Sequence, residues 1–586
     1  MQQIAVLRFE NLSPDAGADW VGRGVSEGLA GAVQPSPSQH VWDVQALHRF
    51  DASLGKRITA VPGVSYELPN ARAGFATRVI CGYYTVSGGD RVEVSAVELD
   101  TGTQQTRKVA SVTGALPQLT QLTVQLARQL GYATQAGLTA SGAALRSYAE
   151  GLETPNLALA REKFGAALAA DPGFGAAYLL LARSDMALAD RAGFSHVMAQ
   201  AAQHGAQIAP YYRASLAALQ AEVQGDAAAR LAALAGLQRA APADPLVLRF
   251  LGDAEVAQGN YGAGIVHYRQ AARAAPQDPD LHNLLAYAHL TQGDESAALR
   301  EAAEYARLAP GGANPADSLG DVQFHFNHFA EATQAYLEAF RRDPDMDASG
   351  ALDKAAVSQL LAGDLTKANQ LHQRYVQVRV ARHDPVAALR QADWYFLTGK
   401  KAEAIASARQ FQQGVTVPQL QAAASTRIAA WQLQLGQTSE AALTLGQPGP
   451  AELTSLLAAF AEAPDDEQFN RRIEQLYPGP ANQKRRLLAS GYRLLLARQW
   501  ARALPLWKAI ADNPNADTAR AIYAFLLFQT GSKTEAAKFA ATTPLWHPNQ
   551  DDVFASLWFR GLLAVRAATG PDAERAARVY QAIGKD

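Results

Sequence analysis

ADPLVLRFLGDAEVAQGNYGAGIVHYRQAARAAP, residues 243–276, is the first of three consecutive segments of equal length. The next two are QDPDLHNLLAYAHLTQGDESAALREAAEYARLAP (277–310) and GGANPADSLGDVQFHFNHFAEATQAYLEAFRRDP (311–344). Prolines therefore recur every 34 residues, at Pro242, Pro276, Pro310 and Pro344. Other residues keep the same period: Gly225, Gly259 and Gly293, and Leu251, Leu285 and Leu319. This period is typical of a helix–turn–helix unit that stacks into a solenoid.

Each recurring residue type has a physical role in such a unit. Small residues near position 20 let the second helix cross the first closely; they are Ala160, Gly264, Ala298 and Ala332. An aromatic residue four positions later fills the adjoining space, as at Phe164, Tyr268 and Tyr336. Proline ends the second helix, and the glycine after the first helix supplies a left-handed cap. In period and positions these segments resemble tetratricopeptide (TPR) repeats.

The repeat pattern predicts an all-α tetratricopeptide superhelical solenoid from residue 141 onward. We expect a TPR array over 141–345, with a regular register from residue 243. Residues 346–445 read as divergent TPR-like helix pairs with longer connections. The proline-rich residues 446–485 read as a degenerate helical or loop segment, and 486–586 as C-terminal TPR units. The last helix pair would form the cap that a solenoid needs for solubility.

Residues 1–135 show strand periodicity and predict a separate α/β domain, the head. The predicted order is β-α-β-α-β-β-β-α, with strands or helices at 4–7, 21–33, 40–47, 65–77, 79–86, 91–99, 104–112 and 119–130. The short apolar run at 4–7 suits a strand that is buried on both faces. The apolar alternation of Arg91–Leu99 slips near Val97, which predicts a β-bulge. Pro69 is expected to interrupt the second helix.

Two separated motifs of the head resemble the TolB-type amino-terminal domain. They are IAVLRFENLSPDAGADWVGRGVSEGLAGAV (4–33), with F-x-N-L-S followed by G-x-G-x-S-E, and the hairpin GYYTVSGGDRVEVSAVELDTGT (82–103). The resemblance spans residues 2–135, and residues 50–75 depart from it. It implies a docking module without catalysis. Such domains often precede TPR repeats in the sensory halves of bacterial membrane Ser/Thr kinases, transcriptional regulators and adenylate cyclases.

Composition narrows the range of partners. The chain has 586 residues, 48% hydrophobic and 18% charged, with a formal net charge of -2. We therefore expect no binding to nucleic acid and no attraction to an anionic membrane surface. Cys81 is the only cysteine, which excludes an intramolecular disulfide. We expect no membrane insertion by this chain and no signal peptide at its start. It would be extracytoplasmic (periplasmic) in a bacterium if an upstream span anchors it, and cytoplasmic otherwise.

Several short motifs mimic catalytic or binding signatures. Gly22–Gly24 lacks the rest of a dinucleotide fingerprint, and Gly531–Thr534 lacks the upstream glycine of a P-loop. Gly24–Gly28 matches G-x-S-x-G but lies inside a predicted helix, whereas a nucleophile elbow needs a sharp strand-to-helix turn. His325 and His328 are only two ligands, and a zinc site needs at least three. We therefore predict no catalytic residue, no cofactor and no metal.

The inner face of the first helix of each repeat is the expected binding groove. Projecting the three regular repeats onto that face gives seven candidates: Arg249, Asp253, Asn283, Tyr287, Asp317, Asp321 and His325. This face combines polar, aromatic and charged residues, with more acidic than basic side chains. A protein or peptide partner of basic or apolar character is therefore expected. The competing interpretation is that these are ordinary solvated helix faces.

Three functions remain open from the sequence. The first is a non-catalytic interaction scaffold or sensor region, resembling the C-terminal half of a bacterial membrane Ser/Thr kinase. The second is the corresponding half of a transcriptional regulator or adenylate cyclase. The third is an enzyme with a site at the junction of head and solenoid.

Overall fold

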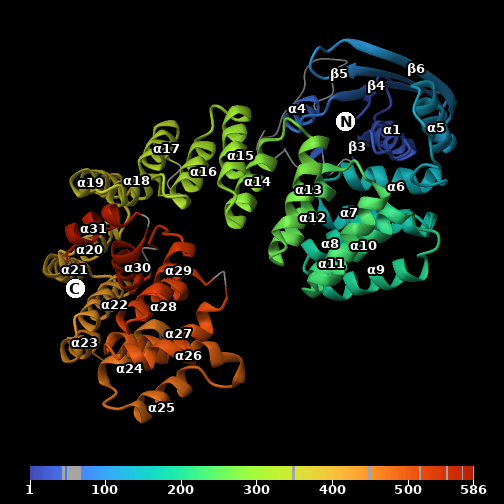
Figure 1. Ribbon diagram of the computed structural model, residues 1–586. Helices are drawn as coiled ribbons and strands as arrows, with labels where there is room; N and C mark the ends of the chain where they lie inside the picture. Colours follow the sequence, from blue (N-terminus) through green and yellow to red (C-terminus); the bar gives the residue numbers. More distant parts are fainter. Residues whose placement is uncertain are drawn as a thin grey trace. The chain divides into compact units, whose positions relative to one another are not determined.

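The computed structural model divides into two compact units, Met1–Leu308 and Ala309–Asp586 (Figure 1). It describes residues 1–42, 47–48, 67–345, 350–446, 451–513, 516–548, 552–570 and 572–584. The first unit contains the head and helices α6 to α15, and the second contains α16 to α31. Across the described residues, each helix is too short or too polar to cross a lipid bilayer.

A six-stranded sheet forms the centre of the head in the described residues. Its strands are β1 (Gln2–Val6), β2 (Glu10–Asn11), β3 (Gln39–Val41), β4 (Arg78–Ser87), β5 (Arg91–Asp100) and β6 (Thr106–Ala115). They lie in the order β3-β1-β4-β5-β6, and β2 pairs with β4. β1 is parallel to β3 and β4, whereas β4, β5 and β6 are antiparallel. The β5–β6 register shifts between Glu98, which pairs with Lys108, and Leu99, which pairs with Thr106. An irregularity is thus present at the predicted place, but the extra residue, Arg107, lies in β6, and the burial of β5 alternates without a slip.

Both faces of β1 are buried, as its apolar run predicts. Ile4 and Val6 belong to the larger core, which α1 (Trp20–Ala32) and α5 (Leu119–Gln129) cover. Ala5 and Leu7 point to the opposite side, into a smaller core with α4 (Leu68–Ala73). The period-two alternation of a strand therefore divides one short sequence between two cores.

Glycines let α1 pack closely against the rest of the head. A Cβ at Gly22 would lie 2.2 Å from the Phe9 carbonyl oxygen, so only glycine allows this approach. Ser26, the centre of the G-x-S-x-G match, is fully buried within α1, and its hydroxyl donates to the Arg23 carbonyl. The motif is thus a packing feature of a helix and forms no nucleophile elbow.

Two head elements differ from the prediction. The second strand, β3, ends at Val41, and residues 43–46 of the predicted strand lie outside the described residues. Pro69 lies in the first turn of α4 and does not interrupt the helix, because the missing N–H of proline is not needed in that turn. Residues 49–66, which include part of the departure from the TolB-type pattern, also lie outside the described residues.

The described solenoid of the first unit consists of antiparallel helix pairs, each packing on the next. The pairs are α6 (Gly142–Glu153) with α7 (Leu157–Ala170), α8 (Gly175–Ala187) with α9 (Arg191–Gln203), α10 (Pro210–Gln224) with α11 (Ala227–Ala240), α12 (Pro245–Ala257) with α13 (Tyr261–Ala274), and α14 (Pro279–Gln292) with α15 (Glu295–Leu308). Gly225, Gly259 and Gly293 all have φ between 70° and 81°, as expected for left-handed caps.

The second unit continues the helix pairs. They are α16 (Ala313–His325) with α17 (Phe329–Arg342), α18 (Ala351–Leu361) with α19 (Leu365–Ala381), α20 (Ala387–Leu397) with α21 (Lys401–Gly414), α22 (Pro418–Gln434) with α23 (Thr438–Leu445), α24 (Glu452–Glu462) with α25 (Asp466–Leu476), α26 (Gln483–Leu496) with α27 (Trp500–Ala511), and α28 (Asp517–Gln529) with α29 (Lys533–Thr542). Helices α30 (Ala555–Thr569) and α31 (Ala573–Ala582) follow. The proline-rich stretch that was expected to be degenerate thus holds the pair α24 and α25; its residues 447–450 lie outside the described residues.

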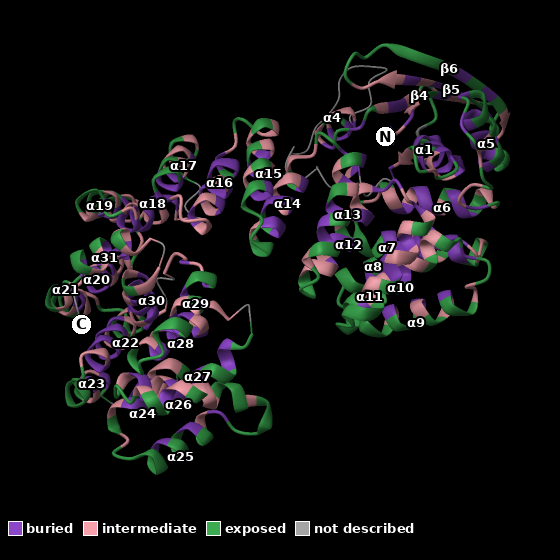
Figure 2. Ribbon diagram, viewed as in Figure 1, coloured by how far each residue is buried: buried purple, intermediate pink, exposed green. Residues whose placement is uncertain are grey.

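The end of the chain packs back into the second unit. α30 contacts α28, α29 and α20, and α31 contacts α18, so the last pair touches repeats far from it in sequence (Figure 1). α30 is buried over most of its length (Figure 2). A helix pair that only capped the end of a solenoid would contact the preceding repeat alone. The last pair therefore also fills the interior of the second unit.

Candidate partner-binding surfaces

Four of the seven predicted groove residues lie on α12 and α14 of the first unit. Arg249 and Asp253 are half-buried and 4.0 Å apart, and the Tyr268 hydroxyl donates a 2.7 Å hydrogen bond to Asp253. On α14, Tyr287 is 37% exposed. The neighbouring Asn283 has a buried Oδ1 that accepts no hydrogen bond from the described residues. We call these four residues, together with the exposed Phe250, the α12–α14 surface.

The head meets this part of the solenoid through β1 and β3. Gln3 Nε2 donates to the carbonyl of Ala274 at 3.0 Å, and His40 Nε2 lies 3.7 Å from the Asp244 carboxylate. A small cleft between them is lined by head and solenoid residues, including Arg249. It encloses about 10 Å³, which is room for about one water molecule. The head therefore borders the α12–α14 surface, and this cleft is too small for a ligand larger than water.

The other three predicted groove residues lie on α16 of the second unit. Asp317 and Asp321 both bind the Lys354 ammonium of α18, at 2.9 and 2.8 Å. Burial lowers the pKa of Lys354, but the two carboxylates outweigh it and raise that pKa overall. The excess of negative charge expected on this face is thus compensated by a lysine of the next repeat, which lies 33 residues beyond Asp321 in sequence.

His325 is half-buried, and burial lowers its pKa. Its ring makes an edge contact with Phe326 at 4.9 Å between centroids. Within the described ranges, no group of three His, Cys, Asp or Glu side chains is arranged to hold a metal ion.

The inner face of the second unit is covered by a segment of the same chain. We call residues 545–548 and 552–558 the C-terminal segment. The His547 ring stacks on Phe324 of α16 at 3.8 Å, and Gln434 of α22 donates to the Val553 carbonyl at 2.9 Å. The Ser556 hydroxyl in turn donates to Gln434 Oε1 at 2.6 Å. The sequence offers no pattern that predicts this coverage, since these contacts join residues more than 100 positions apart.

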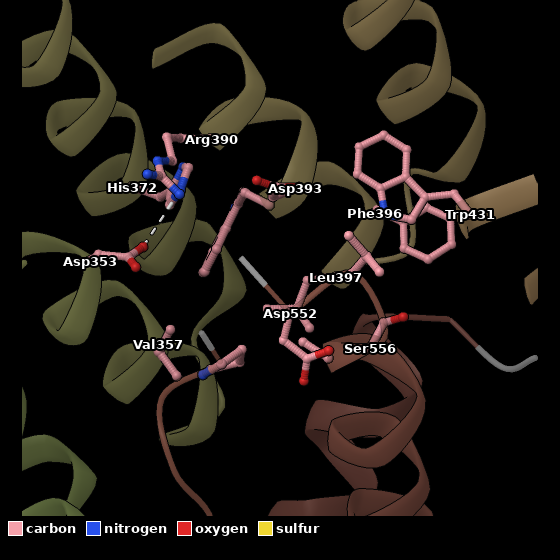
Figure 3. A pocket seen from close by; sticks show the side chains of 14 residues that line it. Asp353, Val357, His372, Arg390, Asp393, Phe396, Leu397, Trp431, Asp552 and Ser556 are labelled. Carbon is pink, nitrogen blue, oxygen red and sulfur yellow. Dashed lines mark ion pairs between the residues drawn. The ribbon is translucent and has the colours of Figure 1, made fainter. Parts of the chain in front are cut away.

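Between the C-terminal segment and the repeats lies a cavity of about 60 Å³ (Figure 3). Its walls come from α18, α19, α20, α22 and the C-terminal segment. The polar side chains that line it are Asp353, His372, Arg390, Asp393, Asp552 and Ser556, and the aromatic ones are Trp394, Phe396 and Trp431. None of these residues was a candidate from the sequence, because they come from the divergent repeats and from the end of the chain.

The junction of head and first repeat holds a buried ionic network. The guanidinium of Arg23, on α1, binds Glu67 and also Glu153 of α6, the latter at 2.7 Å. Arg8 binds the other oxygen of Glu153 at 3.0 Å. Burial would raise the pKa of Glu67, but Arg23 and His48 lower it to about 2. Glu67 is therefore a charged partner of Arg23 and lacks the raised pKa of a general acid. Glu153 fastens α1 to the first repeat through its ion pair with Arg23.

Known proteins match the repeat region. Residues 252–293 match the model of the TPR repeat family. The chain is similar at low identity to solved structures, among them MamA from Desulfovibrio magneticus RS-1, with 15% identity over 29% of this chain and 96% of that one and a TM-score of 0.27. A tetratricopeptide repeat protein from Parabacteroides merdae ATCC 43184 is 17% identical over 43% of this chain and 98% of that one, with a TM-score of 0.31. PilW, a type IV pilus biogenesis factor, is 14% identical over 36% of this chain and 97% of that one, with a TM-score of 0.32. No curated protein sequence matches the chain. The predicted fold class is confirmed: a small α/β domain precedes a TPR-like all-helical solenoid.

Proposed function

We propose that this chain is a non-catalytic scaffold that binds a protein or peptide partner on the α12–α14 surface. The observation that carries the proposal is the exposure of two large aromatic side chains on neighbouring first helices of the array. Phe250 is 42% exposed and Tyr287 is 37% exposed. Exposed aromatic residues are characteristic anchors of protein interfaces, because each buries a large area with little loss of side-chain freedom.

The polar residues of the same surface suit an extended or helical segment. Arg249 and Asp253 offer one charge of each sign, and Asn283 can pair with a main-chain amide or carbonyl. In the second unit the equivalent face is occupied by the C-terminal segment, whose His547 stacks on Phe324. Of the seven groove residues predicted from the sequence, the proposal therefore retains Arg249, Asp253, Asn283 and Tyr287 beside Phe250. It gives less weight to Asp317, Asp321 and His325.

Affinity purification from the source cell, followed by binding measurements with the purified partner, tests this proposal. The double variant Phe250→Ala/Tyr287→Ala should bind the partner about tenfold to a hundredfold more weakly, because interface aromatics are frequent hot spots. Val266→Ala is the matched control, since Val266 is 50% exposed on α13 of the same repeat. A partner that binds the double variant and wild type equally would move the site away from this surface.

We further propose that the chain serves as the sensory half of a bacterial membrane Ser/Thr kinase. The support is the resemblance of residues 4–33 and 82–103 to the TolB-type domain, combined with the repeats that follow. In such a protein the chain would lie outside the cytoplasm. The genomic sequence upstream of Met1 tests this: an in-frame kinase domain and membrane span support it, whereas a winged-helix or cyclase domain would assign the chain to that class instead.

A further inference from the structure

The cavity of the second unit has the composition of a built binding site. In Figure 3, Asp353 and Val357 face it from α18, Trp431 from α22, and Asp552 and Ser556 from the C-terminal segment. It lies in a different unit from the α12–α14 surface, so its function is independent of the scaffold proposal.

Acidic groups outnumber basic ones in the cavity wall. Asp353, Asp393 and Asp552 face a single lining cation, Arg390, among the described residues. Asp393 is also paired with Arg427 Nε at 3.1 Å, just outside the wall. Asp552 accepts hydrogen bonds from Trp558 Nε1 and from the Phe554 amide, at 3.0 and 2.9 Å. The lining therefore carries more carboxylates than guanidinium groups, which favours a cationic ligand.

His372 provides the second, independent indication. Its side chain is 3% exposed, and its ring stacks on Trp394 at 4.5 Å between centroids. Nδ1 has no hydrogen-bond partner among the described residues, although buried polar groups are almost always paired. Nε2 lies 3.6 Å from Asp353 Oδ1. The carboxylate favours the tautomer with its proton on Nε2, so Nδ1 is a lone-pair acceptor in need of an N–H donor.

The remaining walls are aromatic. Phe396 and Trp431 stack at 5.0 Å with an interplanar angle of 11°, and Trp394 lies beside His372. Aromatic faces attract cations through the quadrupole of the ring, most strongly in desolvated sites. The aromatic residues and the carboxylates therefore select the same ligand chemistry.

The size of the cavity limits the ligand further. About 60 Å³ is space for about four to six water molecules. We propose that this cavity binds a small organic cation with N–H donors, namely a guanidinium or primary ammonium group, with Asp353 and His372 as its main acceptors. Such a group is offered both by free amino-acid derivatives and by an arginine or lysine side chain of a peptide.

Isothermal titration of the full chain with matched probes tests the site. The probes are N-acetyl-L-argininamide, its uncharged isostere N-acetyl-L-citrullinamide, and the peptide Gly-Gly-Arg-Gly-Gly. We expect the arginine probe to bind at least about tenfold more tightly than the citrulline probe, because hydrogen bonds to charged groups are roughly twice as strong as neutral ones. Tighter binding of the peptide than of the arginine probe would identify a peptide side chain as the source; equal binding would identify a free small molecule.

Two variants locate the binding. Asp353→Asn removes one charge with little change of shape, and His372→Phe keeps the stack on Trp394 but removes the acceptor. Each should weaken the arginine probe about tenfold or more. Glu467→Gln on α25, with a side chain 83% exposed, should bind like wild type. Melting curves by circular dichroism check that each variant is folded; if His372→Phe is not, Asp353→Asn decides alone.

The opposite outcomes are equally clear. The proposal is overturned if neither cationic probe binds, if the citrulline probe binds as tightly as the arginine probe, or if Asp353→Asn leaves the arginine affinity unchanged. Tighter binding of N-acetyl-L-glutamate would identify Arg390 as the anchor of an anion site and would also overturn it.

Discussion

The ring of Tyr268 occupies the space in which a side chain at Gly252 would stand: a Cβ there would lie 2.4 Å from the ring. The same relationship links Tyr336 with Gly320, and Trp507 with Gly491, each 16 positions apart along the chain. In each pair the aromatic residue comes from the second helix and the glycine from the first. In each repeat the two helices therefore interlock, because the aromatic ring of the second helix packs directly against the backbone of the first helix at the glycine.

Gly252→Ala should therefore destabilise the first unit. The added methyl group overpacks the site against Tyr268, which costs about 1–3 kcal/mol. Gly165→Ala on α7 is the matched control, because a Cβ there meets nothing within 4 Å. It should stabilise the helix by up to about 1 kcal/mol, as alanine favours helix more than glycine does. Urea titrations followed by circular dichroism measure both; equal effects of the two substitutions would contradict the interlock.

Replacement of Glu67 should change the acid stability of the first unit. The pKa of Glu67 is about 2 in the folded protein and 4.5 ordinarily, so the folded state binds its proton less readily than the unfolded state. The resulting stabilisation, about 3 kcal/mol, is complete above pH about 4.5 and is lost as pH falls toward 2. Glu67→Gln should be less stable than wild type at neutral pH, by about 3 kcal/mol, because Arg23 loses a buried partner.

This difference should shrink on acidification. Urea titrations at pH near 7, 4.5 and 2 measure it, with Glu162→Gln on the exposed side of α7 as the control. A difference that stays constant from pH 7 to pH 2 would show that the Glu67 carboxylate is not held in its charged form by Arg23.

Removal of the Lys354 ammonium should destabilise the second unit. In Lys354→Met, Asp317 and Asp321 would face each other without their shared cation, and breaking a buried ion pair costs about 3–5 kcal/mol. The double variant Lys354→Met/Asp317→Asn should recover part of this loss. A double-mutant cycle of melting curves measures the coupling, and a coupling near zero would mean that the lysine does not stabilise these aspartates.

His547→Phe should make the second unit less sensitive to acid. Burial lowers the pKa of His547 to about 3, whereas the unfolded chain binds that proton near pH 6.5. Wild type therefore loses about 1.4 kcal/mol per pH unit at this residue as pH falls from 6.5 toward 3. Phenylalanine keeps the contact with Phe324 and removes the titration. Stability measured across that range should fall less steeply in the variant; an unchanged slope would contradict burial of the ring.

The repeat architecture was predictable because its signals are local. Gly225, Gly259 and Gly293 take left-handed φ values and so end helices wherever they occur. The irregularity near Glu98 was expected at the right place, but in the wrong strand, because the extra residue lies in β6. The Tyr268–Gly252 interlock was also within reach, since the two residues recur at one spacing, yet the sequence alone paired Tyr268 with Gly264.

The site was less predictable because it depends on long-range packing. Lys354 neutralises Asp317 and Asp321 only because α18 is placed beside α16. Nothing local to His547 or Ser556 indicates that these residues cover helices more than 100 positions earlier. Helix periodicity assigns a residue to a face but does not reveal which part of the chain occupies that face.

The return of the chain end to α18 and α20 also affects how the second unit responds to force. The Ile583 carbonyl lies where a side chain of Gly399 would be, and it accepts a 2.8 Å hydrogen bond from Arg560. Arg566 binds Asn327, 239 residues earlier, at 3.0 Å. In an open repeat array each repeat contacts only its neighbours, so under force the repeats can unfold one after another from an end. Because these contacts join residues far apart in sequence, the second unit should instead resist extension and unfold in one step. It should also fold more slowly than its helix content suggests, because the distant contacts must form together.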